Sequence, residues 1–334
     1  MERVLSGLRP TGKLHLGHYH GVLTNFIKLQ DMYECYFFVA DLHALTTNYA
    51  KTEDIQSSVI QMLADWIAVG IDPEKASIFI QSSIPQHSEL HTILSMITPL
   101  GWLERVPSYK EKLGEETPSD LHTYGFLGYP VLMASDILIY KAHKVPIGED
   151  QLAHLEFTRE IVRRFNYLYK TVFPEPQPLL TTAPKVPGTD GRKMSKSYDN
   201  CLYISDPPDV ISKKILTMVT DPHRIRRTDK GNPDLCPVYD LHKLHTPPDR
   251  LQEINTGCRT AGIGCVDCKK VVIGEINTLL APIREKRESL VKQPDILRNI
   301  VERGNKKAAT FASATMQEVK EAIRIVYDFR TAGL

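Results

Sequence analysis

The sequence predicts an α/β fold with a parallel sheet, followed by a mostly α-helical region. Two short apolar runs rich in β-forming residues, at 35–40 (CYFFVA) and 77–81 (SIFIQ), alternate with stretches of helical spacing such as 55–67. Strands that alternate with helices form parallel sheets. Strand signals fade after about residue 193. Because a single core rarely grows beyond ~250–300 residues, a chain of 334 residues is expected to form more than one unit.

The first elements follow from apolar spacing and turn residues. Residues 4–7 (VLSG) predict a strand that ends at the turn GLRPTG, and the segment from Leu16 to Gln30 predicts a helix. The apolar segment 126–140 has helical spacing, which places Tyr129, Met133, Asp136 and Tyr140 on one face.

The later elements repeat this order and then become helical. KVPIG at 144–148 predicts a strand and turn, and 150–165 predicts an amphipathic helix. The Pro-rich stretch 173–193 is typical of a linker or an active-site loop. Helical spacing returns at 207–219, 238–256, 268–292 and 314–329.

The charge is divided unevenly along the chain. The net charge is +1, but residues 1–192 carry 17 basic and 22 acidic side chains (net −5), and 193–334 carry 24 and 18 (net +6). A basic half indicates nucleic-acid binding, although scattered, solvated Lys and Arg side chains are the ordinary explanation. The sequence has no apolar run of about 18 residues and no apolar signal core at the N-terminus, so we expect a cytoplasmic protein that does not enter a membrane.

Two histidines follow the first predicted strand. The segment Lys13–His18 reads KLHLGH, and neither GxGxxG nor GxxxxGK[ST] occurs in the chain. His15 and His18 at a helix N-terminus would offer donors to a phosphate, and Gly17 would allow a close approach. Taken alone, two such histidines are more often ordinary surface residues.

A second motif, KMSKS at 193–197, ends the Pro-rich stretch. It presents two ammonium groups and two hydroxyls where a loop could close over a polyphosphate, although a charged loop alone is usually solvated surface. Together, HLGH and KMSKS resemble the two signature motifs of the class I aminoacyl-tRNA synthetases, and the resemblance extends over essentially the whole chain.

This resemblance implies a reaction in which an amino-acid carboxylate attacks the α-phosphorus of ATP. It implies that His15 and His18 stabilise the transition state, that Lys193 and Lys196 hold the β- and γ-phosphates, and that Mg²⁺ accompanies the phosphates. The expected ATP-binding residues are Arg9, Pro10, Thr11, Gly17, His18, Gly148, Glu149, Asp150, Val186, Lys193, Met194, Ser195, Lys196 and Ser197.

Two of these assignments have alternatives. In the family pattern the segment Gly148–Asp150 binds the ribose, but an acidic helix N-cap would have the same sequence. Arg9 stands where the family often has Gln.

Asp136 indicates which amino acid this member of the family activates. A carboxylate in an apolar helix is costly to bury unless it is paired, which favours ligand recognition over a partly exposed helical Asp. The related tyrosine enzymes have Gln three positions earlier, whereas this chain has Met133, which suits an indole whose N–H donates to Asp136. The chain is therefore identified as a member of the bacterial tryptophanyl-tRNA synthetases. The expected tryptophan-binding residues are Leu5, where some members have an aromatic, His43, Tyr129, Met133, Asp136, Val145, Ile147 and Gln151.

Four cysteines lie close together in the basic half, at Cys236, Cys258, Cys265 and Cys268. Four thiolates suit tetrahedral Zn²⁺ or a [4Fe–4S] cluster, and chemistry alone favours zinc. A subset of the family has a similar arrangement with [4Fe–4S], so the resemblance favours iron–sulfur. Unliganded thiols are the third alternative, to which Cys35 and Cys201 are assigned.

The resemblance also predicts domains and partners. We expect a Rossmann-like catalytic domain at 1–192, an anticodon-binding helical domain at 193–300, and a C-terminal helical segment at 301–334 that packs back on the catalytic domain. The expected partners are tRNA(Trp), L-tryptophan, ATP and a second copy of the chain. The residues expected to contact RNA phosphates are Arg224, Arg226, Arg227, Arg259, Lys269 and Lys270.

Three other functions remain as alternatives. They are the tyrosine enzyme, which Met133 opposes, an RNA-binding module that has lost catalysis, and a free nucleotidylyltransferase, which would not need a basic helical domain.

Overall fold

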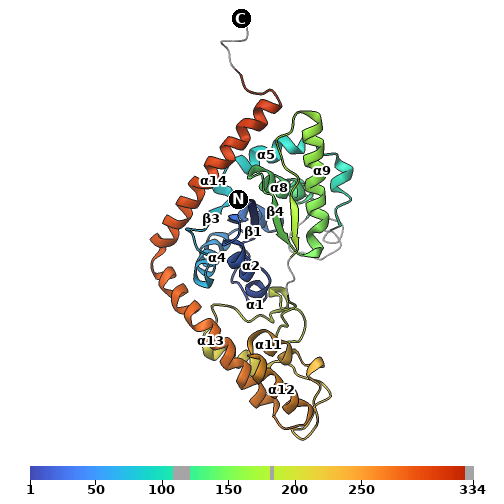
Figure 1. Ribbon diagram of the computed structural model, residues 1–334, viewed down its shortest axis with the longest axis vertical. Helices are drawn as coiled ribbons and strands as arrows, with labels where there is room; N and C mark the ends of the chain where they lie inside the picture. The colour runs from blue at the N-terminus through green and yellow to red at the C-terminus, as the bar shows by residue number, and fades with distance from the viewer. Residues whose placement is uncertain (108–120, 181–183, 328–334) are drawn as a thin grey trace, which may run out of the picture.

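The computed structural model describes residues 1–107, 121–180 and 184–327. Its centre is a sheet in the order β3-β2-β1-β4-β5, in which every neighbouring pair is parallel (Figure 1). The strands are β1 Arg3–Leu8, β2 Glu34–Val39, β3 Ala76–Ile80, β4 Lys144–Ile147 and β5 Gln177–Leu180. The predicted fold class is confirmed.

Helices cover both faces of this sheet. The helices of this region are α1 Leu16–His18, α2 Thr24–Leu29, α3 Asp41–Asn48, α4 Ile55–Val69, α5 Gln86–Ser95, α6 Leu100–Leu103, α8 Tyr124–Ile139 and α9 Leu152–Leu168. Phe37 belongs to the core with α2 and α4, and the next residue, Phe38, belongs to the core with α5, α8 and α9. Burial on both faces explains why the strands read as continuous apolar runs.

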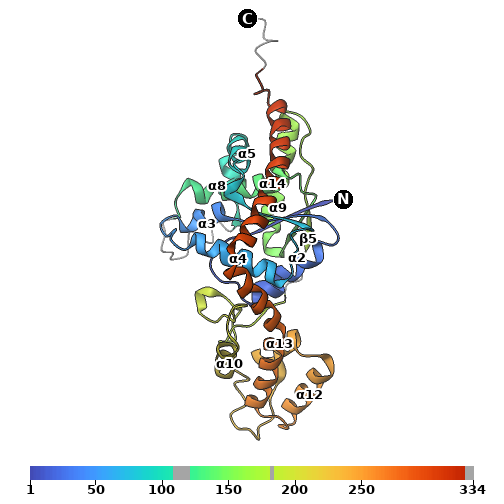
Figure 2. The same ribbon diagram turned by 90° about the vertical axis from the view of Figure 1, so that its left-hand side faces the viewer.

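The remaining helices form a second lobe and a long segment that runs back along the sheet domain. They are α10 Pro208–Thr217, α11 Pro237–His245, α12 Pro248–Arg259, α13 Cys265–Lys292 and α14 Pro294–Ala322. Figures 1 and 2 show α11 and α12 below the sheet domain, with α13 rising from them and α14 continuing along β3. No helix within the described ranges is both long and apolar enough to cross a membrane.

Helix α14 lies directly against the edge strand β3. The side-chain carbonyl of Asn305 accepts the backbone N–H of Ile80 at 3.1 Å. A Cβ on Gly304 would lie 1.8 Å from the carbonyl oxygen of Ile78, so only glycine allows this approach. The helix therefore covers a strand edge that would otherwise expose unpaired backbone groups.

The structure corrects several predicted boundaries. The Pro-rich stretch, predicted as a linker or loop, contains β5, because Pro is compatible with an edge strand whose other side has no partner. The single helix predicted at 238–256 is two helices separated at Pro247 and Pro248, since a helix seldom continues through a residue that precedes proline. The last predicted helix, 314–329, begins inside the much longer α14, which ends at Ala322, and its residues 328–329 lie outside the described residues. The predicted helix from Leu16 to Gln30 contains a π-helical stretch at Tyr19–Leu23.

Candidate functional site

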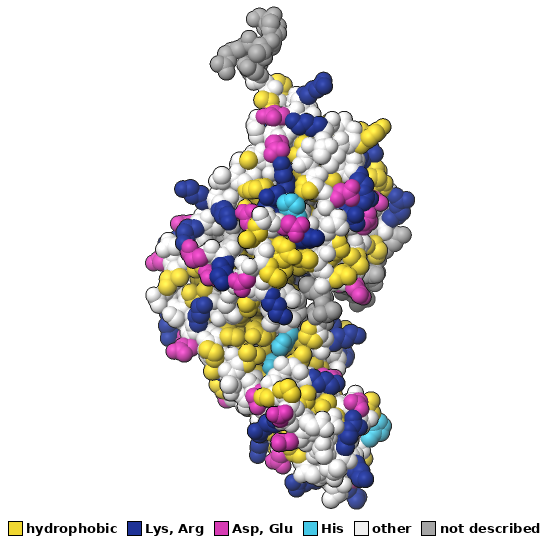
Figure 3. Space-filling view, viewed as in Figure 1, with side chains coloured by type: hydrophobic (Ala, Val, Ile, Leu, Met, Phe, Trp, Pro, Cys, Tyr) yellow, Lys and Arg dark blue, Asp and Glu magenta, His cyan; other side chains and the backbone are white. Residues whose placement is uncertain are grey.

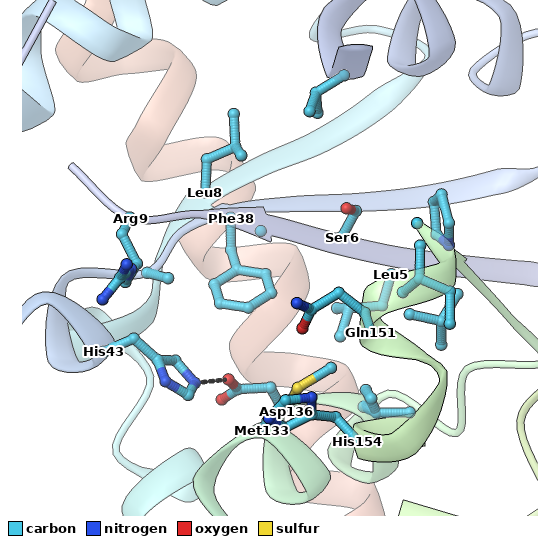
Figure 4. Close-up of a pocket in the computed structure, with 18 of the residues that line it drawn as sticks. Leu5, Ser6, Leu8, Arg9, Phe38, His43, Met133, Asp136, Gln151 and His154 are labelled. Atoms are coloured by element: carbon cyan, nitrogen blue, oxygen red, sulfur yellow. Dashed lines mark hydrogen bonds and ion pairs between the residues drawn. The ribbon is translucent and has the colours of Figure 1, made fainter. Parts of the chain in front are cut away.

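A cavity of about 450 Å³ opens at the carboxyl ends of β1, β2 and β4 (Figure 4). Strand β1 lies between β2 and β4, so the cavity is at the point where the strand order reverses, which is where parallel α/β sheets bind ligands. Its volume is typical of a small-molecule site. Helices α2, α3, α8 and α9 and the π-helical stretch Tyr19–Leu23 contribute further walls.

The structure brings all eight predicted tryptophan-binding residues to this cavity. The wall is mainly apolar, and its polar groups include Asp136 and His43 on one side and Gln151 on another. The eight residues are Leu5, His43, Tyr129, Met133, Asp136, Val145, Ile147 and Gln151. Their contact with a ligand stays a prediction.

Asp136 is the centre of a buried hydrogen-bond network. Its Oδ2 is 2.7 Å from Nε2 of His43, and its Oδ1 is 2.6 Å from Nδ1 of His87 and accepts from Nε2 of Gln81 at 2.7 Å. Burial alone would raise the pKa of Asp136, but the hydrogen bonds from His43 and His87 lower it to about 2. The carboxylate is therefore ionised at neutral pH and can only accept hydrogen bonds.

Three of the residues that build this site were not predicted from the sequence. Gln81 and His87 are fully buried and lie in the segment after β3, and Phe38 fills the cavity wall next to Gly7. A buried carboxylate requires donors, so the unassigned Gln and His that follow a predicted strand were the available signal. Tyr140, which helical spacing places on the same face as Asp136, contacts His87 and does not line the cavity.

The two signature motifs lie side by side. The segment that leads to His15 pairs with residues 202–204, just after KMSKS, through hydrogen bonds from Leu16 N to Leu202 O and from Ile204 N to Leu14 O. Nζ of Lys196 donates to the carbonyl oxygen of Thr11 at 2.8 Å. Residues almost 200 positions apart thus meet at the N-terminal end of the first helix.

The imidazoles of His15 and His18 stand next to each other, with ring centroids 3.8 Å apart. Nδ1 of His18 accepts the backbone N–H of His15 at 3.3 Å, so the ring proton of a neutral His18 is on Nε2. Burial, together with Lys196, lowers the pKa of His15 to about 4, and burial with His15 and Lys196 lowers that of His18 to about 3. Both rings are therefore neutral hydrogen-bond donors. A Cβ on Gly17 would lie 2.8 Å from the His15 ring, so glycine is required there.

Asn200, which was not predicted as a site residue, holds the KMSKS loop in place. Its side-chain oxygen accepts the backbone N–H of Ser195 at 2.8 Å, and its amide donates to Asp190 Oδ1 at 2.7 Å and to the carbonyl of Lys193 at 3.2 Å. The side chain is almost fully buried. One asparagine thus connects both ends of the loop.

The other predicted ATP-binding residues differ in their relation to the cavity. Arg9 and Gly148 line the cavity, and Asp150 accepts from Gln151 at 2.9 Å. Lys193 and Ser197 are exposed, and Met194 is buried with its N–H bonded to the carbonyl of Val186. The structure does not bring the KMSKS lysines into the cavity itself.

The four clustered cysteines converge on a small pocket in the second lobe, together with Arg224. Burial, with the three neighbouring sulfurs, raises the pKa of Cys268 to about 12. Among the described residues, the structure shows no group of three or more His, Cys, Asp or Glu side chains placed to hold a metal ion. The donor set suits a metal, but the observed placement does not reproduce a ligand shell.

Two of the predicted RNA-binding cations are internal, which corrects that prediction. Arg224 is buried and donates to the carbonyls of Arg227 and Ile263. Lys269 is buried and donates to the carbonyls of Leu216 and Met218, where it caps the end of α10. Because these two cations bind backbone carbonyls inside the protein, the number of Lys and Arg residues in the sequence overestimates the positive charge on the surface of this lobe.

The other predicted RNA-binding cations are Arg226, Arg227 and Lys270, which are exposed, and Arg259, which pairs with Asp234. Figure 3 shows acidic and basic side chains interspersed on the visible face of the lower lobe.

Three comparisons place these features among known proteins. The profile of the family "tRNA synthetases class I (W and Y)" matches residues 1–281. The tryptophan–tRNA ligase of Thermotoga maritima is 49% identical, with 97% of this chain and 100% of the relative covered, and that of Ralstonia nicotianae is 44% identical, with 98% and 99% covered. The structure of tryptophanyl-tRNA synthetase from Campylobacter jejuni in complex with ADP and tryptophan has a TM-score of 0.88 at 33% identity, with 96% and 99% covered.

Proposed function

Because this chain belongs to the class I tRNA synthetase family of the tryptophan and tyrosine enzymes, we propose a residue-level account of how it works. The chain is an enzyme that activates L-tryptophan with ATP and transfers it to tRNA(Trp), releasing pyrophosphate and AMP. The observation that carries the account is the apolar cavity that ends at the ionised, buried carboxylate of Asp136.

The indole lies in the cavity with its N–H toward Asp136. Met133 offers an apolar surface in place of a second polar group, and the cavity wall is formed largely by Leu5, Phe38, Val145 and Ile147. An acceptor with no donor of its own selects a ring that carries an N–H, because only such a ring can add a hydrogen bond to those that Asp136 accepts from His43, His87 and Gln81.

Activation takes place at the open side of the cavity. A carboxylate oxygen of tryptophan attacks the α-phosphorus of ATP, the bond between the α-phosphorus and the bridging oxygen breaks, and pyrophosphate leaves; Mg²⁺ bound to the phosphates would neutralise part of their charge. The ribose hydroxyl at the end of the tRNA then attacks the activated carbonyl, and AMP leaves. His15 and His18 donate hydrogen bonds to the phosphate oxygens as neutral imidazoles, and Lys193 and Lys196 supply the positive charge.

The second lobe, from α10 to α13, contacts the tRNA. Support comes from the exposed cations Arg226, Arg227 and Lys270 and from the excess of basic residues beyond residue 192. The sequence divisions at 193 and 301 remain proposals for domain boundaries.

The four cysteines hold a structural metal group, with an iron–sulfur cluster preferred to zinc. Their chemistry and their convergence on one pocket support this assignment. Iron and sulfide analysis of anaerobically purified protein tests it. One zinc per chain, or no metal at all, contradicts the iron assignment.

The chain acts as a homodimer. Support comes from exposed apolar side chains around α5, α6 and α8, among them Met96, Leu100 and Tyr124. Sedimentation velocity gives about twice the monomer mass if this is correct, and the monomer mass alone excludes it.

Amino-acid-dependent exchange of radiolabelled pyrophosphate into ATP tests the proposed function. We expect exchange with tryptophan and little with tyrosine, followed by charging of a tRNA(Trp) transcript. Exchange with tyrosine alone would overturn the tryptophan account, and binding of tRNA without any exchange would support the non-catalytic RNA-binding alternative.

A further inference from the structure

His87 lies behind the tryptophan cavity and does not line it. It is a fully buried residue of α5, with Nδ1 2.6 Å from Oδ1 of Asp136 and Nε2 2.8 Å from the hydroxyl of Tyr140. The imidazole therefore joins the carboxylate on one side to a phenol on the other. Nothing in the activation chemistry described above uses either residue.

The two contacts determine which nitrogen carries the proton. If Nε2 held the only proton, Nδ1 would point a lone pair at the carboxylate over 2.6 Å, which is repulsive. A neutral His87 therefore carries its proton on Nδ1 and accepts the phenol O–H of Tyr140 on Nε2, and an imidazolium would also donate from Nδ1. In both forms His87 donates to Asp136.

Tyr140 is itself fixed. Its ring stacks on Tyr36 with a centroid separation of 4.9 Å and is fully buried between α8 and the sheet. Burial and the nearby Asp136 raise the pKa of its phenol, so the hydroxyl keeps its proton. A rigid donor thus selects the tautomer of His87.

The two carboxylate oxygens of Asp136 therefore have different partners. Oδ1 is occupied by His87 and by Gln81, whereas Oδ2 faces the cavity-lining His43 (Figure 4). Because both donors to Oδ1 come from buried groups, the carboxylate cannot rotate without losing two hydrogen bonds. Oδ2 keeps a lone pair for a ligand in a constant direction.

We propose that His87, oriented by Tyr140, is a positioning residue that gives the site its selectivity for an indole N–H by holding Oδ2 of Asp136 toward the ligand. This inference rests on the proposed function, because it assigns tryptophan to the cavity. It predicts that the loss of His87 weakens recognition of the N–H more than binding of the rest of the ring system.

The test compares tryptophan with β-(benzothiophen-3-yl)alanine, which replaces the indole N–H by sulfur. Pyrophosphate exchange gives kcat/KM for each substrate in the wild type, H87L, Y140F and Y36F. We expect H87L to reduce the preference for tryptophan about tenfold, mainly through KM for tryptophan, with the KM for ATP within twofold of the wild type. Y140F removes only the tautomer-selecting donor, and we expect it to reduce the preference about threefold.

Y36F is the matched control, because it removes a phenol oxygen from the same aromatic stack but one that contacts Glu34. We expect it to leave the preference unchanged. Equal losses on both substrates in H87L would show a purely structural role and overturn the proposal. If H87L does not fold, the Y140F variant provides the test. An unchanged preference for tryptophan in Y140F then overturns the proposal. Absence of tryptophan-dependent exchange in the wild type would instead reject the proposed function.

Discussion

Replacing Asn200 by alanine tests how the KMSKS loop is held for catalysis. The variant N200A loses three side-chain hydrogen bonds, to the N–H of Ser195, to Asp190 and to the carbonyl of Lys193. At a net value of about 1 kcal/mol each, the ordered loop loses about 2–3 kcal/mol. Since 1.4 kcal/mol is a factor of ten, we expect kcat/KM for ATP to fall by about thirtyfold to a hundredfold.

The assay is tryptophan-dependent pyrophosphate exchange at varied ATP concentration, with thermal unfolding measured in parallel. N255A is the matched control, because Asn255 of α12 donates to the hydroxyl of Tyr239 in α11 and accepts from Arg259, far from the loop in sequence. We expect this control to keep its ATP kinetics. If N200A shows ATP kinetics within twofold of the wild type, the reasoning that Asn200 orders the loop is refuted.

Three further predictions concern other parts of the molecule. K196A removes a cation at the phosphate-binding loop, so single-turnover adenylate formation should slow by about a hundredfold, and a change below threefold would contradict its role. The pKa of Asp136, lowered from 3.8 to about 2, stabilises the fold above about pH 4 by about 2 kcal/mol, and this contribution disappears as the pH falls through about 2. The difference in free energy of unfolding between the wild type and D136N should therefore shrink between pH 5 and pH 2. A difference that stays constant over this pH range would be inconsistent with the prediction. G304A should lower the free energy of unfolding by about 1–3 kcal/mol, because its Cβ overlaps the carbonyl of Ile78, and an unchanged urea midpoint would argue against tight docking of α14.

Local sequence patterns were sufficient to predict most strands of the sheet and the helix that carries Asp136. The strand at 35–40 and the helix around Asp136 carry strong apolar signals, and the structure contains β2 and α8 at these positions. Edge strand β5 was missed because its composition, QPLL between prolines, resembles a loop, and its place depends on pairing with β4. Tertiary context thus determined the element that sequence patterns predicted least well.

The hydrogen-bond partners within the site could not be predicted from spacing. Gln81 and His87 meet Asp136 only because β3 and α5 pack against α8, and Asn200 meets Ser195 only because the loop folds back on itself. The buried cations show the same limitation. Lys269 has the sequence environment of a surface residue, yet it donates to two carbonyls at the end of α10.

Equilibrium binding of tryptophan to the wild type and to D136A, measured by calorimetry, tests the central claim most directly. We predict one tryptophan per chain in the wild type, an affinity at least tenfold weaker in D136A, and much weaker binding of tyrosine to the wild type. Equal affinity of the wild type and D136A for tryptophan, or a preference of the wild type for tyrosine, would contradict the claim that this cavity recognises an indole through its buried carboxylate.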